Sequence, residues 1–85
     1  MTKHDKLLKK FLSKSQDFSF KELKTLLKRF GYTEIKTGKT SGSRVAFYHK
    51  EKKHIIRIHK PHPQDNLKKY QIDLIEEELK RQDVI

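Results

Sequence analysis

The stretch RVAFYHKEKKHIIRIH, residues 44–59, decides the fold of this chain. In its first part Val45 and Phe47 fall on one side of an extended chain, because side chains alternate between the two sides of a strand. In its last part Ile56 and Ile58 share a side in the same way. The charged run EKK between the two parts is typical of a turn. The pattern therefore predicts two antiparallel strands, over residues 44–49 and 54–59.

A well-signalled helix lies before these strands. Ser19 and Glu22 have the S-x-x-E spacing of a capping box, in which each side chain binds a backbone N–H at the start of a helix. Phe18 and Leu23 are placed to form the hydrophobic staple that accompanies this motif. Gly31 is typical of the position just after a helix. The apolar stripe between these signals consists of Leu23, Leu26, Leu27 and Phe30.

Three further elements complete the chain. Residues 5–12 have an amphipathic pattern that predicts a short helix, and residues 32–37 predict a strand that ends at Gly38. Pro61 and Pro63 end the last strand. A final helix is predicted over residues 67–82, with Asp65 or Asn66 as its cap and an apolar face made of Leu67, Tyr70, Leu74, Ile75 and Leu79.

The order of these elements predicts an α+β fold. We expect an αβββα domain, with a three-stranded antiparallel sheet, helices on one face of it and a short extra helix at the N-terminus. The predicted divisions are a helical extension and linker (1–17), the αβββα domain (18–82) and a C-terminal tail (83–85). A chain of 85 residues has room for one small core of this kind.

The charge of the chain points to a polyanionic partner. The 21 Lys and Arg residues outnumber the 11 Asp and Glu residues, so the formal net charge is +10. Residues 36–62 hold eight of the basic residues, one acidic residue and four of the five histidines. Because neutralising phosphates releases counterions, such a segment is typical of nucleic-acid binding.

Other classes of protein are excluded by what the sequence lacks. The chain has no cysteine, so it forms no disulfide and offers no thiolate nucleophile or zinc-thiolate site. It has no apolar run of membrane-spanning length and no signal-peptide pattern at Met1. We therefore expect a cytoplasmic protein with no membrane partner.

The runs ELKTLLKRFGY, TGKTSGSRVAFYH and RIHKPHP, followed by a short helix, occur in an order that resembles the HicA family of toxins. The resemblance extends from about Phe20 to Leu79. It implies a double-stranded-RNA-binding-like fold and a type II toxin–antitoxin system. It also implies an mRNA-cleaving toxin that a HicB-type antitoxin neutralises, with scope for a higher-order toxin–antitoxin complex.

One departure from the family pattern concerns the catalytic group. The family usually has a histidine, its proposed catalytic residue, after the loop glycine and a small residue. Here the stretch reads Gly42-Ser43-Arg44-Val45, so Arg44 stands where the histidine is expected. The later histidine–proline segment of the family does have a counterpart, in residues 59–63.

Cleavage of RNA without a metal needs a base, an acid and a cation that stabilises the phosphorane charge. Histidine suits proton transfer because its ordinary pKa is about 6.5. Arginine keeps its proton but binds two phosphate oxygens at once, so Arg44 suits an electrostatic clamp. His59, on the predicted side of the sheet that holds Arg57 and Arg44, is the first candidate for the proton transfer, and His62 is the second.

The loop of residues 38–43 is either a polar hairpin loop or a phosphate-binding loop. Its glycines allow close approach of the backbone, and its hydroxyls, amides and Lys39 suit phosphate. The resemblance to the HicA family favours phosphate contact. An ATP site is excluded because the G-x-x-x-x-G-K-[ST] spacing is missing. The predicted RNA-binding residues are Lys39, Thr40, Ser41, Ser43, Arg44, His49, Lys52, Lys53, Arg57 and Lys60.

The remaining histidines and acidic residues receive no catalytic role. His49 and His54 flank the charged turn, where we expect solvated side chains or partial cations against phosphate. His59 and His62 have a spacing that suits a metal, but only Asp65 lies near enough in sequence to join them. We therefore predict no metal and no cofactor. The run EEE within 76–78 is predicted to be a solvated helix face.

Three functions stay open at this point. The first is an endoribonuclease toxin, and the second is a non-catalytic RNA-binding module of the same fold in which Arg44 marks the loss of chemistry. The third is a protein whose basic surface binds only an acidic protein partner. Salt-dependent affinity for RNA separates the first two from the third.

Overall fold

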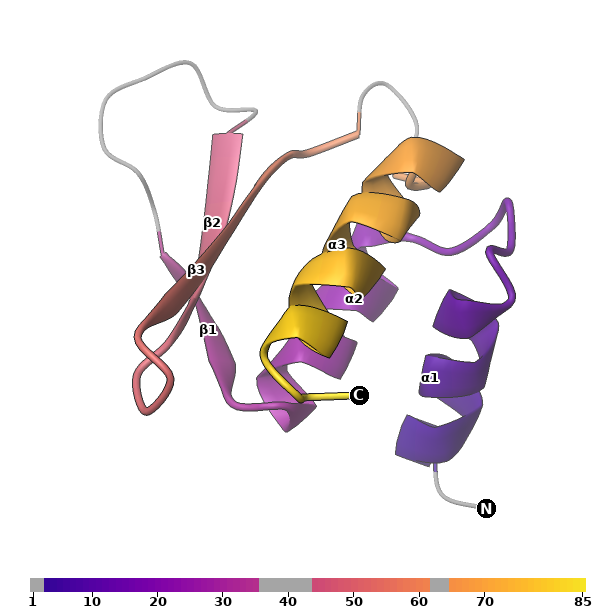
Figure 1. The fold of residues 1–85 in the computed structure, drawn as a ribbon. Helices are drawn as coiled ribbons and strands as arrows, with labels where there is room; N and C mark the ends of the chain where they lie inside the picture. The colour runs from indigo at the N-terminus through magenta and orange to yellow at the C-terminus, as the bar shows by residue number, and fades with distance from the viewer. Residues whose placement is uncertain (1–2, 36–43, 62–64) are drawn as a thin grey trace.

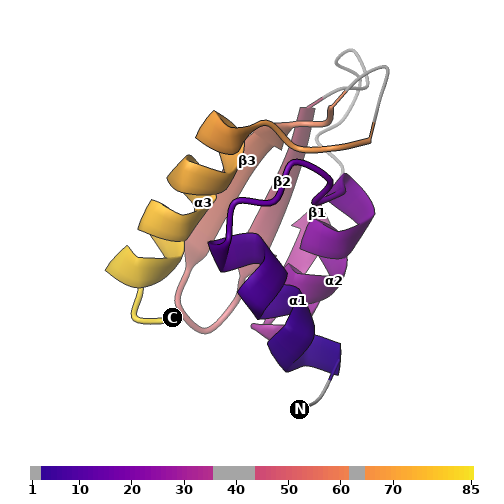
Figure 2. The ribbon, with the colours of Figure 1, turned by 90° about the vertical axis from the view of Figure 1, so that its right-hand side faces the viewer.

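The computed structural model describes residues 3–35, 44–61 and 65–85 of the chain (Figure 1). Its elements, in order, are α1 (Lys3–Leu12), α2 (Phe20–Arg29), β1 (Tyr32–Ile35), β2 (Arg44–His49), β3 (His54–His59) and α3 (Lys69–Arg81). The strands form one antiparallel sheet in the order β1-β2-β3. The helices lie on one face of this sheet, with α1 outside α2 and α3 (Figure 2). The predicted α+β fold with an αβββα order is confirmed.

The β2–β3 hairpin forms over the predicted residues. Its register runs from Arg44 opposite His59 to His49 opposite His54. The alternating apolar side chains face the helices, and Val45, Phe47 and Ile56 are buried. The first strand is observed over Tyr32–Ile35 of the predicted 32–37, and residues 36 and 37 lie outside the described part.

The start of α2 has the predicted capping box. The Ser19 hydroxyl accepts a hydrogen bond from the Glu22 N–H at 3.0 Å, and a Glu22 carboxylate oxygen accepts one from the Ser19 N–H at 3.0 Å. Phe18 and Leu23 are fully buried. Gly31 follows the helix with a φ of +99°, which a glycine adopts without strain.

The predicted cap of the last helix is wrong. The residue before α3 is Lys68, whose N–H donates to the side-chain oxygen of Gln71 at 3.0 Å. Asp65 instead accepts a backbone hydrogen bond from Phe20 at 2.7 Å, and Asn66 pairs with Ser19 in an isolated bridge. The backbone around residues 65–67 is therefore used to pair with the start of α2 and does not cap α3.

The predicted apolar face of α3 is only partly correct. Leu67, Ile75 and Leu79 are buried as expected, but Tyr70 is 60% exposed and Leu74 is 57% exposed. The buried stripe also contains Gln71 and Ile72. Each helical residue is rotated by about 100° from the last, so Tyr70 and Leu74 lie at least about 100° around the helix from each residue of the stripe through 72, 75 and 79.

The N-terminal helix packs against the αβββα domain. Phe11 is fully buried, and its ring meets that of Phe18 edge-on with centroids 5.5 Å apart. The ammonium of Lys10 donates to both oxygens of Glu22 at 3.0 Å. The ammonium of Lys14 forms ion pairs with Asp73, at 2.8 Å, and with Glu76. In the described parts of the chain, no helix has the length and apolar character needed to cross a membrane.

Candidate functional site

The face of the sheet that the helices leave open brings predicted site residues together at one end. Arg44 on β2 lies directly opposite His59 on β3, and Ala46 lies opposite Arg57. Residues directly opposite in an antiparallel pair have Cβ atoms about 4.5–5.5 Å apart. Arg44, Arg57 and His59 are all exposed. The hairpin register therefore creates a compact group of two guanidinium groups and one imidazole.

The open face of the sheet carries no acidic side chain among its described residues. By strand alternation it consists of Thr33, Ile35, Arg44, Ala46, Tyr48, Ile55, Arg57 and His59. The acidic strand residue Glu34 faces the helices, where it pairs with Lys24 at 2.8 Å. Asp73 and Glu76 are on α3, where they pair with Lys14. The described side chains of the open face therefore carry positive charge and no acidic group, which favours an anion.

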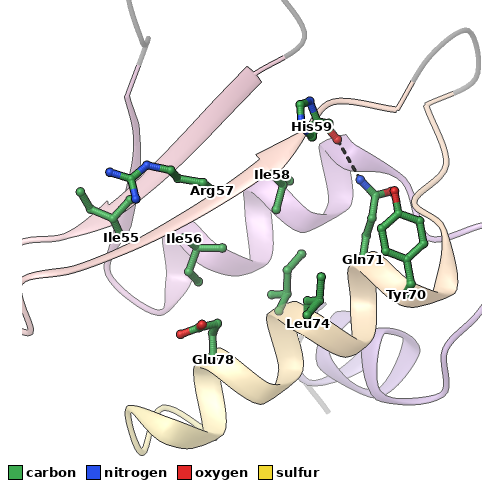
Figure 3. Close-up of a pocket in the computed structure, with 10 residues that line it drawn as sticks. Ile55, Ile56, Arg57, Ile58, His59, Tyr70, Gln71, Leu74 and Glu78 are labelled. Atoms are coloured by element: carbon green, nitrogen blue, oxygen red, sulfur yellow. Dashed lines mark hydrogen bonds between the residues drawn. The ribbon is translucent and has the colours of Figure 1, made fainter.

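The backbone of His59 is held in place from α3 while its side chain stays exposed. Gln71, which is 7% exposed, donates a hydrogen bond from its amide nitrogen to the His59 carbonyl at 2.9 Å (Figure 3). Its amide oxygen accepts from the Lys68 N–H. The imidazole of His59 makes no hydrogen bond or ion pair with another described residue. The exposed imidazole therefore projects from a backbone position that α3 holds.

The lysines assigned to RNA binding fall into two places. Lys60 follows β3, with its ammonium 5.6 Å from the centroid of the Phe20 ring, which packs against Phe47 on the helix-facing side of the sheet. Lys52 and Lys53 lie in the turn at the other end of the hairpin. Five strand residues of about 3.3 Å each separate that turn from His59, a distance of about 16 Å. Only an extended ligand reaches both groups.

The prediction that His49 is solvated is wrong. Its side chain faces the helices and is 7% exposed. The ring packs edge-on against Tyr32, with centroids 5.0 Å apart, and Nδ1 accepts a hydrogen bond from the Lys52 N–H at 3.1 Å. His49 is two residues after Phe47 on β2, so the two side chains lie on the same, buried face of the sheet. The hydrogen bond from Lys52 attaches the turn to this buried side chain.

His54 is also enclosed, contrary to the prediction of a solvated side chain. Its Nε2 lies 2.9 Å from a carboxylate oxygen of Glu78, and its Nδ1 lies 2.8 Å from the Tyr32 hydroxyl. Because a carboxylate only accepts, Nε2 donates, and in neutral His54 Nδ1 accepts from Tyr32. Burial, together with the charge of Glu78, raises the pKa of Tyr32. The hydrogen bonds of His54 with Tyr32 and Glu78 therefore connect β1, β3 and α3.

Several predicted site residues lie outside the described part of the chain. These are Lys39, Thr40, Ser41 and Ser43 of the loop, and His62. The described residues on either side of them, Arg44 and Pro61, lie at the end of the sheet that holds His59. Within ranges 3–35, 44–61 and 65–85, no three side chains of His, Cys, Asp or Glu gather as a metal site.

Gln71 is the residue near the site that sequence reasoning missed. Its signal is its spacing, since it falls four residues after Leu67 and four before Ile75, inside the buried stripe. A polar side chain in such a stripe needs a buried hydrogen-bond partner. The sequence contains that signal but not the identity of the partner.

Comparison with known proteins identifies the family. A family model described as the HicA toxin of bacterial toxin–antitoxin systems matches residues 20–82, which cover α2, the three strands and α3. Neither the curated proteins nor the solved structures contain a match. Since the matched part is well over half of the chain, the protein belongs to the HicA family of bacterial toxins.

Proposed function

We propose that this protein is an endoribonuclease toxin that binds mRNA on the open face of its sheet. The observation that carries the proposal is the pairing of Arg44 with His59 across β2 and β3. A guanidinium and an imidazole at adjacent, exposed positions provide two of the three groups that cleavage needs, a clamp for the phosphate oxygens and a proton acceptor.

His59 is the proposed general base. It takes the proton of a ribose 2′-hydroxyl, and the 2′-oxygen forms a bond to the neighbouring phosphorus. The bond from phosphorus to the 5′-oxygen then breaks, which leaves a 2′,3′-cyclic phosphate and a 5′-hydroxyl. The departing oxygen needs a proton, for which His62 is our candidate. Arg44 and Arg57 stabilise the charge that develops on the phosphate oxygens.

An RNA-binding module without catalysis is the second candidate, and one observation favours it. His59 is the single histidine on the described part of the open face, so no second histidine there shares the proton transfer. If the histidine that the family uses for catalysis has been replaced by Arg44, the remaining surface binds RNA without cutting it. In either case, the family implies a cognate antitoxin, which we propose to be of the HicB type.

Cleavage of an RNA oligonucleotide in EDTA tests the proposal. The wild-type protein is expected to produce 2′,3′-cyclic phosphate ends, and a 2′-deoxy substitution at the cleaved position is expected to block them. His59→Ala is expected to reduce the cleavage rate by about 10²- to 10⁴-fold, the usual contribution of a general base. Lys28→Ala, an exposed change on α2, serves as the control and should cleave normally.

The two candidates give different results in this assay. A wild-type protein that binds the oligonucleotide in a salt-dependent way and leaves it intact supports the binding module. Cleavage that survives His59→Ala but needs added divalent metal contradicts the proposed mechanism. In cells, growth arrest when the protein is expressed without the antitoxin supports the endoribonuclease toxin.

A further inference from the structure

A groove of about 230 Å³ lies between β3 and α3 (Figure 3). Its lining includes Ile55, Ile58, Tyr70 and Leu74, with Arg57 and His59 along the strand. Ile55, Tyr70 and Leu74 are 38%, 60% and 57% exposed, and they are three of the five exposed large hydrophobic residues of the described chain. On a chain with 38% charged residues, such a gathering marks a surface that a partner covers.

The backbone beside this groove belongs to an edge strand. The sheet order is β1-β2-β3, so β3 has a strand neighbour on one side only. The His59 carbonyl accepts a hydrogen bond from α3 and therefore points away from β2. By strand alternation, the N–H and C=O groups of Ile55 and Arg57 point in the same direction. They form no hydrogen bond to α3 in the described structure, and so they remain open to pairing with a further strand.

The charge at the rim of the groove selects an acidic occupant. The guanidinium of Arg57 makes no ion pair with any described residue, and the imidazole of His59 has no partner there either. The carboxylate that lines the groove, Glu78, is hydrogen-bonded to His54 and paired with Arg81. Asp73 and Glu76 of α3 are paired with Lys14. An extended segment with an apolar side chain for the groove and a carboxylate for Arg57 complements both features.

We propose that the groove between β3 and α3 is the docking site of the antitoxin. An extended antitoxin segment adds to the edge of β3, places an apolar side chain against Leu74 and Tyr70, and pairs a carboxylate with Arg57. Because Arg57 and His59 line both the groove and the open face, the bound segment covers the RNA site at the same time. This inference rests on the proposed toxin function, which supplies the need for a neutralising partner.

Two other occupants fit the surface less well. A second copy of this chain carries a net charge of +10, so its approach to Arg57 is repulsive. An RNA backbone has no apolar group that would fill the space beside Leu74 and Tyr70. Each of these occupants gives its own result in the experiment below.

Leu74→Glu tests the proposal, with Leu12→Glu as the matched control. Both leucines are exposed on helices, but Leu12 is on α1, outside the groove. The probe is the purified antitoxin encoded beside the toxin gene, and its affinity is measured by titration calorimetry. Leu74→Glu is expected to weaken binding by about 30-fold or more, the effect of a central contact, while Leu12→Glu leaves binding unchanged. Circular dichroism confirms that both variants are folded.

Toxicity separates this inference from the proposed function. Cells that express Leu74→Glu alone should stop growing as with wild type, and the antitoxin should no longer rescue them. If wild type causes no arrest, the proposed function fails while the binding measurement still decides the docking site. Loss of RNA cleavage in folded Leu74→Glu would assign the groove to RNA and overturn the inference. If the wild-type toxin forms a concentration-dependent dimer and Leu74→Glu abolishes it, the groove binds a second copy of the chain, and the inference is likewise overturned.

Hydrogen exchange tests the strand pairing independently of any substitution. On binding of the antitoxin, the amides of Ile55 and Arg57 are expected to exchange at least about ten times more slowly. Amides of β1, the other edge of the sheet, should keep their rates. Slower exchange confined to the amides of β1 would place the antitoxin at the opposite edge of the sheet and would contradict docking at β3.

Discussion

At residue 31 the chain turns from α2 into β1 with a φ of +99°, and the space beside that turn is already filled. A Cβ atom at this position would lie 2.8 Å from Nε2 of His49. Gly31→Ala is therefore expected to destabilise the protein, by about 1–2 kcal/mol for the left-handed backbone alone and by more for the contact. Urea denaturation measures the loss in the free energy of unfolding.

The same measurement in a His49→Ala background separates the two causes. Without the imidazole the close contact disappears, so the cost of Gly31→Ala should fall to that of the backbone conformation. An equal cost in both backgrounds would show that the contact with His49 contributes nothing. The sequence predicts Gly31 as the end of a helix, because that signal is local. It does not predict the contact with His49, which comes from a residue 18 positions later.

At the scale of single elements, α1 is attached by carboxylates whose ionisation decides how firmly it is held. Burial raises the pKa of Glu22, but hydrogen bonds from the Ser19 N–H and from Lys10 outweigh it, and the pKa stays below its ordinary value. The hydrogen bond from Lys14, with a further one from Lys80, lowers the pKa of Glu76. A carboxylate whose pKa is lowered by folding stabilises the folded state at neutral pH and loses that contribution on acidification.

We therefore expect the free energy of unfolding to decrease as the pH falls from the ordinary glutamate pKa of about 4.3 through the lower folded values. The double variant Glu22→Gln, Glu76→Gln should be less stable at pH 7 and should show a smaller decrease over the same interval. Denaturation in urea at a series of pH values measures both effects. Equal decreases in the wild type and the double variant would contradict a role for these two carboxylates.

Elements differ in how far sequence alone determines them. The β2–β3 hairpin and the capped α2 are predictable because neighbouring residues carry their alternation and their caps. The exposed face of α3 is not, since Tyr70 and Leu74 continue the apolar pattern of Ile75 and Leu79. Which of two adjacent stripes faces the core depends on where β3 lies. The misassigned residues are those that line the groove, so the error coincides with the surface that we assign to a partner.

At the scale of the whole molecule, topology separates the charges. The sequence predicts an excess of positive charge between residues 36 and 62, and alternation predicts that Arg44, Arg57 and His59 share a face. The arrangement of the opposite charges depends on the fold, because helix packing brings Asp73 and Glu76 to Lys14 and Glu34 to Lys24. The burial of His49 and the partial burial of His54 likewise follow from the positions of Tyr32 and Glu78.

This separation of charge predicts which cations contact RNA. Each Lys or Arg that neutralises a phosphate of a single strand contributes about 0.7 to the slope of log affinity against log salt. Arg57→Ala on the open face is expected to reduce the slope by about that amount and to weaken binding at low salt. Arg29→Ala, an exposed arginine on the helical face, removes the same charge from the chain and should leave the slope unchanged.

Fluorescence anisotropy with a 2′-O-methyl RNA, which cannot be cleaved, measures both slopes from about 50 to 200 mM salt. The comparison is matched, because both variants have the same net charge and each loses one exposed guanidinium. A smaller slope for Arg57→Ala alone supports RNA binding on the open face. A smaller slope for Arg29→Ala alone would move the RNA to the helices, and equal slopes for all three proteins would mean that neither arginine contacts a phosphate. The absence of any salt-dependent affinity for RNA would contradict both RNA-binding functions and would support an acidic protein as the partner of this basic chain.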